Sequence, residues 1–130
     1  MKKLLLTLLT MLMLTGSAWA EWVKVSESLD DEQVGYIDPG TIRKNGNLVR
    51  VWEIHDYKSR QKKVFGELST RFRALYDCRQ ERVQILSLSS HSGPMARGST
   101  LFQTLTGDGT WLDIPPASMS EDTLKIVCAK

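Results

Sequence analysis

The segment around Asn45-Gly46 constrains the fold more than any other part of this sequence. Two strand-like runs, 41–44 and 48–54, flank the dipeptide. Asn-Gly between such runs favours a tight hairpin turn, because both residues tolerate positive φ. On the second run Trp52 and Ile54 share one face, and the valines share the other. The sequence therefore predicts an antiparallel hairpin at this point.

The same alternation of apolar and polar residues recurs along most of the chain. Further strands are expected over 22–25, 34–38, 71–78, 83–89, 101–106 and 110–114. Pro39-Gly40 is expected to end the strand before it, and Gly107-Asp108-Gly109 to turn the last two strands into a second hairpin. Residues 58–67 and 90–99 are expected to form loops. The pattern predicts an antiparallel sheet of about six strands.

The C-terminal segment has a helical pattern instead. Pro115-Pro116 stops the last strand, and Ser118-Met119-Ser120-Glu121 fits a capping box, in which a serine caps the backbone and a glutamate reaches back. Leu124, Val127 and Cys128 then fall on one helical face. The fold class expected is α+β, with a C-terminal helix packed on one face of the antiparallel sheet.

Residues 1–20 have the composition of a secretory signal peptide. Lys2 and Lys3 precede an apolar run that is shorter than the roughly 20 residues needed to span a bilayer. Ala18-Trp19-Ala20 supplies the small residues that a signal peptidase reads, so cleavage is expected after Ala20. No cysteine near this point offers a site for lipid attachment. We expect a periplasmic or secreted protein that does not span the membrane.

The remaining residues, 21–130, suit one domain, whose charges balance. Two of the 17 Lys and Arg residues leave with the signal, and the other 15 equal the 15 Asp and Glu. This balance gives no indication of nucleic-acid binding.

Cys78 and Cys128 are expected to form a disulfide. Two cysteines in an exported domain usually pair, and Cys78 lies on the apolar face of its strand with Phe72, Ala74 and Tyr76. The bond would fasten the helix to the sheet. A catalytic thiol would need a neighbouring base, and a redox pair would need CxxC spacing; the sequence shows neither. A zinc site would need more ligands than two cysteines and two distant histidines.

Several elements together resemble the surface-adhesin protein E-like domain of Gram-negative bacteria, over essentially the whole of 21–130. They are, in order, Trp22, Tyr36-Ile37-Asp38, Thr41-Ile42, Val49-Arg50-Val51-Trp52, Tyr76-Asp77-Cys78, Trp111 with Pro115, and Cys128. The resemblance implies a sheet with a disulfide-tethered C-terminal helix, and no enzymatic activity. It also implies binding of host matrix and serum proteins and an ability to dimerise, as for the founding adhesin. That adhesin is a lipoprotein, whereas this sequence lacks the cysteine that would carry the lipid.

A basic stretch is the candidate binding site, and the resemblance places adhesive contacts in the corresponding region. Its residues are Lys58, Arg60, Lys62, Lys63, Arg71 and Arg73. Such a patch would attract an acidic polysaccharide or an acidic protein surface. The competing interpretation is a solvated loop whose charges keep a neutral protein soluble.

The other candidate sites have simpler structural explanations, and no catalytic residue, cofactor or metal is expected. His55 and His91 lack a clustered carboxylate or a nucleophile elbow. Trp22, Trp52 and Trp111 could line a ligand groove, but tryptophans on separate strands more often build the core, and that is the expectation here. Leu86, Leu88 and Val49 are candidates for an open apolar face that would favour a homodimer. The alternative function is therefore a periplasmic structural or envelope-assembly protein that acts by dimerising.

Overall fold

The computed structural model describes residues 20–60 and 63–129. The expected signal segment thus lies outside the described residues except for Ala20, as do Gln61 and Lys62. Within the described ranges, seven strands form one antiparallel sheet. The strands are β1 (Val23–Glu27), β2 (Gln33–Asn45), β3 (Leu48–Tyr57), β4 (Ser69–Asp77), β5 (Arg82–His91), β6 (Thr100–Thr104) and β7 (Leu112–Asp113). A short 3₁₀ helix, η1 (Pro94–Ala96), follows β5, and α2 (Met119–Val127) follows β7.

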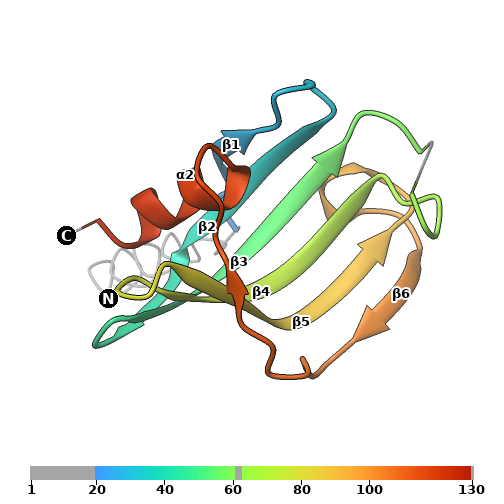
Figure 1. Ribbon diagram of the computed structural model, residues 1–130. Helices are drawn as coiled ribbons and strands as arrows, with labels where there is room; N and C mark the ends of the chain where they lie inside the picture. The colour runs from blue at the N-terminus through green and yellow to red at the C-terminus, as the bar shows by residue number, and fades with distance from the viewer. Residues whose placement is uncertain (1–19, 61–62, 130) are drawn as a thin grey trace, which may run out of the picture.

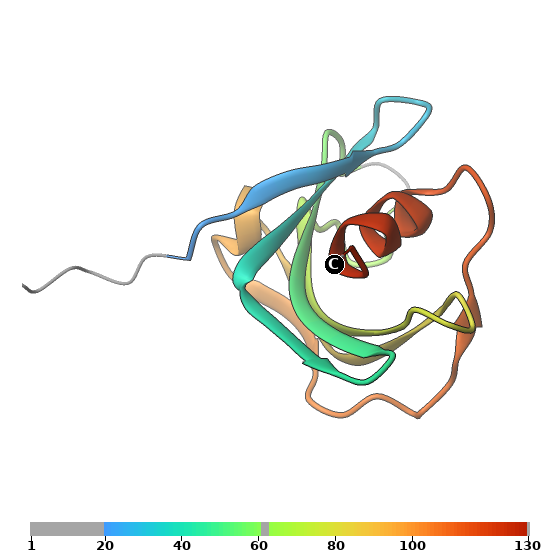
Figure 2. The ribbon, with the colours of Figure 1, turned by 90° about the vertical axis from the view of Figure 1, so that its left-hand side faces the viewer.

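The sheet has the strand order β1-β2-β3-β4-β5-β6, with β7 pairing with β5. It is strongly curled, and α2 lies against its concave side (Figures 1 and 2). We call this side the inner face and the opposite side the outer face. The expected α+β fold is therefore confirmed, as is the hairpin at Asn45-Gly46, where Gly46 has a φ of +61°.

The core lies between the inner face and the helix. It comprises Ile37, Val49, Val51, Phe72, Ala74, Tyr76 and Val83 from the strands, and Leu124 and Val127 from α2. The core residues from β3 and β4 are the positions at which alternation turns a side chain inward, as expected for Phe72, Ala74 and Tyr76.

The helix is held at both ends. At its start, the Ser118 hydroxyl accepts a hydrogen bond from the Glu121 N–H at 3.1 Å. The Glu121 carboxylate reaches back to the Ala117 N–H at 3.4 Å, one residue before the expected cap position. At its end, Cys128 is bonded to Cys78, closing a loop of sequence separation 50. The expected disulfide is confirmed, and it joins the helix to the strand that ends at Asp77.

The expected second hairpin over 101–114 is wrong. β6 and β7 both pair with β5 instead of with each other, with Leu88 opposite Thr104 and Val83 opposite Leu112. Gly107 explains the difference, because its N–H donates to the Leu86 carbonyl at 2.7 Å. A Cβ at this position would lie 2.0 Å from the Ile85 carbonyl oxygen, so the chain can run this close to β5 only at glycine.

The strand at 34–38 does not end at Pro39-Gly40. β2 continues to Asn45 through a register irregularity between Asp38 and Arg43. Proline offers no N–H to the ladder, and the Thr41 side chain bridges the gap. Its hydroxyl donates to the Asp38 carbonyl at 2.7 Å and accepts from the Trp52 N–H at 3.0 Å.

The expected tryptophan core is also wrong. Trp22, Trp52 and Trp111 are each only half-buried. Trp52 lies on the outer face, because it alternates with the inward-facing Val51. The expected open apolar face of Leu86, Leu88 and Val49 is wrong for two of these residues. Val49 belongs to the core, and Leu88 packs against the core.

Candidate binding surface

The structure separates the basic stretch into two groups. Lys58, Arg60 and Lys63 lie in the loop between β3 and β4, whereas Arg71 and Arg73 lie on β4. Lys62 lies outside the described residues. The two groups have different electrostatic surroundings, so they are described separately as the loop group and the strand group.

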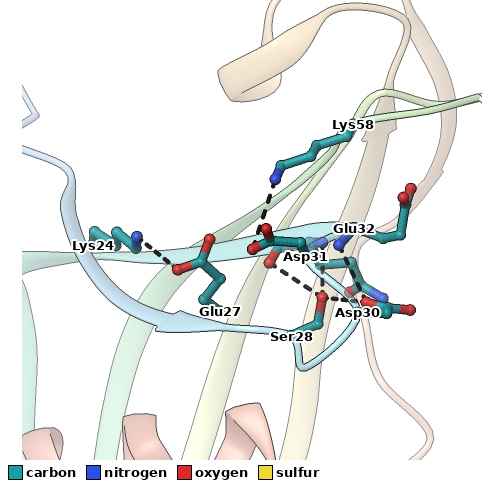
Figure 3. A network of polar contacts seen from close by, with 8 residues as sticks. Lys24, Glu27, Ser28, Asp30, Asp31, Glu32 and Lys58 are labelled. Carbon is teal, nitrogen blue, oxygen red and sulfur yellow. Dashed lines mark hydrogen bonds and ion pairs between the residues drawn. The ribbon is translucent and has the colours of Figure 1, made fainter.

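Acidic side chains accompany the loop group. The turn between β1 and β2 carries Asp30, Asp31 and Glu32, and Lys58 reaches it, with its Nζ 3.8 Å from the Asp31 carboxylate (Figure 3). The pKa of Asp30 lies below its ordinary value, chiefly because the Ser28 hydroxyl donates to it, and the charge of Lys63 acts in the same direction. Part of the positive charge of this loop is therefore compensated within the protein.

Two other members of the loop group organise the loop itself. Arg60 Nη1 donates to the Ser92 carbonyl at 2.8 Å and to the Gly66 carbonyl at 3.2 Å. Lys63 Nζ lies 3.8 Å from the centre of the Tyr57 ring, in a cation–π contact. These contacts place the loop against the segment that follows β5.

The strand group lies on the outer face with two arginines that the sequence reasoning missed. Arg73 lies opposite Trp52, and Arg50 lies opposite Arg43 in the β2–β3 hairpin. The Arg71 guanidinium carbon is 5.4 Å from the centre of the Trp52 ring. The signal for Arg50 was present, because it alternates with the valines of β3 and so shares the face of Trp52. The pairing of β2 with β3 then adds Arg43.

A shallow pocket of about 220 Å³ opens in this face. Its lining residues are Gly40, Thr41, Arg43, Arg50, Trp52 and Arg73. Arg43 Nη1 donates to the carbonyls of Gly40 and Ile42 at 3.0 and 2.9 Å, which holds its side chain along the hairpin. The Arg73 Nε is buried and has no hydrogen-bond partner among the described residues.

The histidines do not form a catalytic group with the carboxylates. Ser89 Oγ and His91 Nε2 are 2.8 Å apart, but the buried His91 Nδ1 has no partner among the described residues. His55 packs edge-on against Phe72, and burial lowers its pKa to about 4, so the ring is neutral near pH 7. In the part of the chain that the structure describes, no three His, Cys, Asp or Glu residues are grouped to hold a metal ion.

A buried carboxyl group lies on the inner face. Glu53 is 1% exposed, and its Oε2 accepts a hydrogen bond of 2.6 Å from the Tyr76 hydroxyl. Burial raises the pKa of Glu53 to about 7, with the Tyr76 hydrogen bond acting weakly in the opposite direction. Alternation with Val49 and Val51 placed this glutamate on the apolar face, which is a signal that the sequence reasoning did not use.

Solved structures of Haemophilus influenzae protein E share this fold. One match covers 87% of each chain, with 12% sequence identity and a TM-score of 0.58. A second crystal form gives the same identity and TM-score, over 82% of this chain and 87% of that one. The protein from a non-typeable strain gives 11% identity and a TM-score of 0.53, over 88% and 79%. At such low identity these matches establish similarity of fold.

The family model agrees with this comparison. No curated protein sequence matches the chain. Within the described ranges, no helix has the length and apolar character required to cross a bilayer. The model of the family described as surface-adhesin protein E matches residues 22–129, which includes every strand and the disulfide-bonded helix. The chain therefore belongs to the surface-adhesin protein E family.

Proposed function

We propose that this protein is an exported, non-enzymatic binding module that uses its basic side chains to contact host matrix or acidic polymers. The family match over 22–129 carries the proposal, because an adhesin family implies an exported or surface protein that binds other molecules. The Cys78–Cys128 disulfide is consistent with an oxidising compartment. Signal cleavage after Ala20 and a periplasmic or secreted location are part of the same proposal.

The test is direct binding by the protein purified after export, with its disulfide intact. Immobilised extracellular-matrix proteins and heparin serve as probes, and binding is measured at low and at raised salt. We expect saturable binding that weakens as salt screens the basic side chains. Absence of binding to every probe at low salt contradicts the proposal. Cell fractionation and N-terminal sequencing test the location and the cleavage site separately.

A second candidate function, assembly through a homodimer, is favoured by the edge strand β6. This strand has one sheet neighbour, β5, and exposes Leu101 and Phe102, with the exposed Leu105 following it. An exposed apolar edge can pair with a second copy. Sedimentation over a concentration series tests this proposal. A dimer that Leu101→Lys dissociates supports it, and a monomer at all concentrations contradicts it.

A further inference from the structure

We propose that the outer face of β2, β3 and β4 is a binding site for a sulfated polysaccharide, with Arg43, Arg50, Arg71 and Arg73 as its anion-binding groups. This inference rests on the proposed binding function and assigns it a surface and a ligand class. It also moves the site from the basic loop to the sheet. We call this set of residues, together with Trp52, the arginine track.

The charges of the arginine track lack carboxylate partners in the part of the chain that the structure describes. Among the described residues, no carboxylate oxygen lies within 4.0 Å of any guanidinium of the arginine track, whereas Lys58 of the loop pairs with Asp31. Two of the acidic groups on the outer face are engaged elsewhere, and a third, Asp38, lies opposite Trp52 and accepts from the Gly40 N–H at 3.0 Å. Asp77 pairs with Arg82 at 3.1 Å, and Asp56 accepts from the Met95 N–H at 2.7 Å. The positive charge of the track is therefore available to an external anion.

The arginines of the track follow one another at short intervals across the sheet. Arg71 and Arg73 are two residues apart on one strand, so their Cα atoms are about 7 Å apart. Arg73 and Arg50 are diagonal neighbours on paired strands, at about 7 to 8 Å, and Arg50 faces Arg43 at about 5 Å. The track is thus a line of about 20 Å with a cation at each step. Such a line matches a flexible chain that carries an anionic group on successive sugar rings.

The chemistry of the arginine track, and of the Trp52 ring beside it, suits a sulfated sugar. The planar guanidinium group binds two oxygens of one anion at the same time, which suits sulfate groups and gives directed hydrogen bonds. The half-buried Trp52 lies opposite Arg73 and two residues along β3 from Arg50, and it lines the same pocket. Its flat apolar surface can receive the C–H face of a sugar ring.

Other macromolecules fit this face less well. A protein partner of standard size needs an interface of about 800 Å² with an apolar centre, yet none of the exposed large apolar side chains lies on β2, β3 or β4. The strands β3 and β4 are internal to the sheet, so a peptide cannot add to them as a strand. Duplex DNA needs a basic surface longer than the arginine track. Toward the other end of β2 the charge changes sign, because the acidic turn at Asp30 and Asp31 lies at the opposite end of that strand from Arg43.

The experiment compares two double variants of the protein purified after export. Arg50→Gln/Arg73→Gln removes two charges from the track, and Lys58→Gln/Lys63→Gln removes two charges from the loop. Titration calorimetry measures the affinity for size-fractionated heparin, and chemically desulfated heparin is the matched ligand. We expect the track variant to lose about tenfold or more in affinity and the loop variant less than about threefold. Circular dichroism and thermal melting establish that both variants remain folded.

Several results would overturn the assignment. Equal losses in the two variants indicate a response to net charge, and loss in the loop variant alone places the site in the loop; in both cases the proposed binding function stands. Equal affinity for desulfated heparin excludes sulfate recognition. Competition by duplex DNA or polyglutamate as strong as that by heparin excludes a polysaccharide site. If the wild type binds matrix proteins but no heparin, the inference fails and the proposed function survives. If it binds neither, both fail.

Discussion

Replacement of Glu53 by glutamine tests whether the core holds a neutral carboxyl group. The pKa of Glu53 is raised from 4.5 to about 7 in the folded protein, chiefly because the side chain is removed from water. Below pH 4.5 the group is protonated in both the folded and the unfolded chain, so the contribution of Glu53 to the free energy of unfolding has its full value there. Between pH 4.5 and 7 the unfolded chain releases the proton and the folded chain keeps it, so the free energy of unfolding falls as pH rises.

The size of this effect follows from the two pKa values. Each unit of difference corresponds to 1.36 kcal/mol, so the wild type should lose about 3 kcal/mol of stability from this group as pH rises through 7. Glutamine keeps an oxygen that accepts from the Tyr76 hydroxyl, but it does not ionise. We expect Glu53→Gln to be nearly as stable as the wild type at pH 5 and more stable at pH 8 by about 3 kcal/mol.

Urea unfolding at pH 5, 6, 7 and 8, with the disulfide intact, measures the effect. Glu121→Gln is the matched control, because the pKa of the exposed Glu121 is lowered through its hydrogen bond to Lys125. Its titration therefore affects stability below pH 4.5, outside the range of the experiment. Equal pH dependence in the wild type and in Glu53→Gln between pH 5 and 8 would refute the reasoning, since it would mean that Glu53 ionises as readily in the fold as in water.

Three further substitutions test the helix attachment and the outer face. Cys128→Ser removes the bond that closes a loop of sequence separation 50, and this should lower the free energy of unfolding by about 4 kcal/mol. On heating, the circular dichroism signal of the helix should be lost before that of the sheet. An unchanged melting temperature would exclude a stabilising disulfide. Ser118→Ala removes the hydroxyl that accepts from the Glu121 N–H and should cost about 1 kcal/mol in urea unfolding, whereas Ser118→Asp should preserve the cap. Asp38→Asn removes a negative charge next to Trp52 in the register yet keeps the oxygen that accepts from the Gly40 N–H, so heparin affinity should rise by about twofold at low salt. Unchanged affinity would show that heparin binds away from this face.

The sequence was informative for three features that depend on neighbouring residues. The Asn45-Gly46 turn, the alternation along β4 and the Ser118 cap are all local, and all three occur in the structure. The disulfide could be inferred because each cysteine falls on the apolar face of its own element. The path of the chain along β5 at Gly107 could not be inferred, because the close contact that requires glycine involves the backbone of β5, about 20 residues earlier in the sequence.

The candidate site shows the same limit. Proximity in sequence grouped Lys58 and Lys63 with Arg71 and Arg73, but the first pair faces an acidic turn that lies some 30 residues earlier along the chain. The arginines of the outer face come together through register, since Arg43 meets Arg50 only when the hairpin closes. Which charges are compensated is therefore a property of strand pairing, and a linear reading of the basic stretch does not contain it.

The strand order has a consequence for how the domain folds. From β1 to β6, every strand pairs with its neighbour in sequence, so the sheet can grow from the Asn45-Gly46 hairpin by successive short loop closures. The contact of α2 with β1 is different, because it joins segments about 100 residues apart. Docking of the helix is therefore the step with the largest entropic barrier. An oxidised chain, in which Cys78 already holds the helix near the sheet, should refold faster than a reduced one.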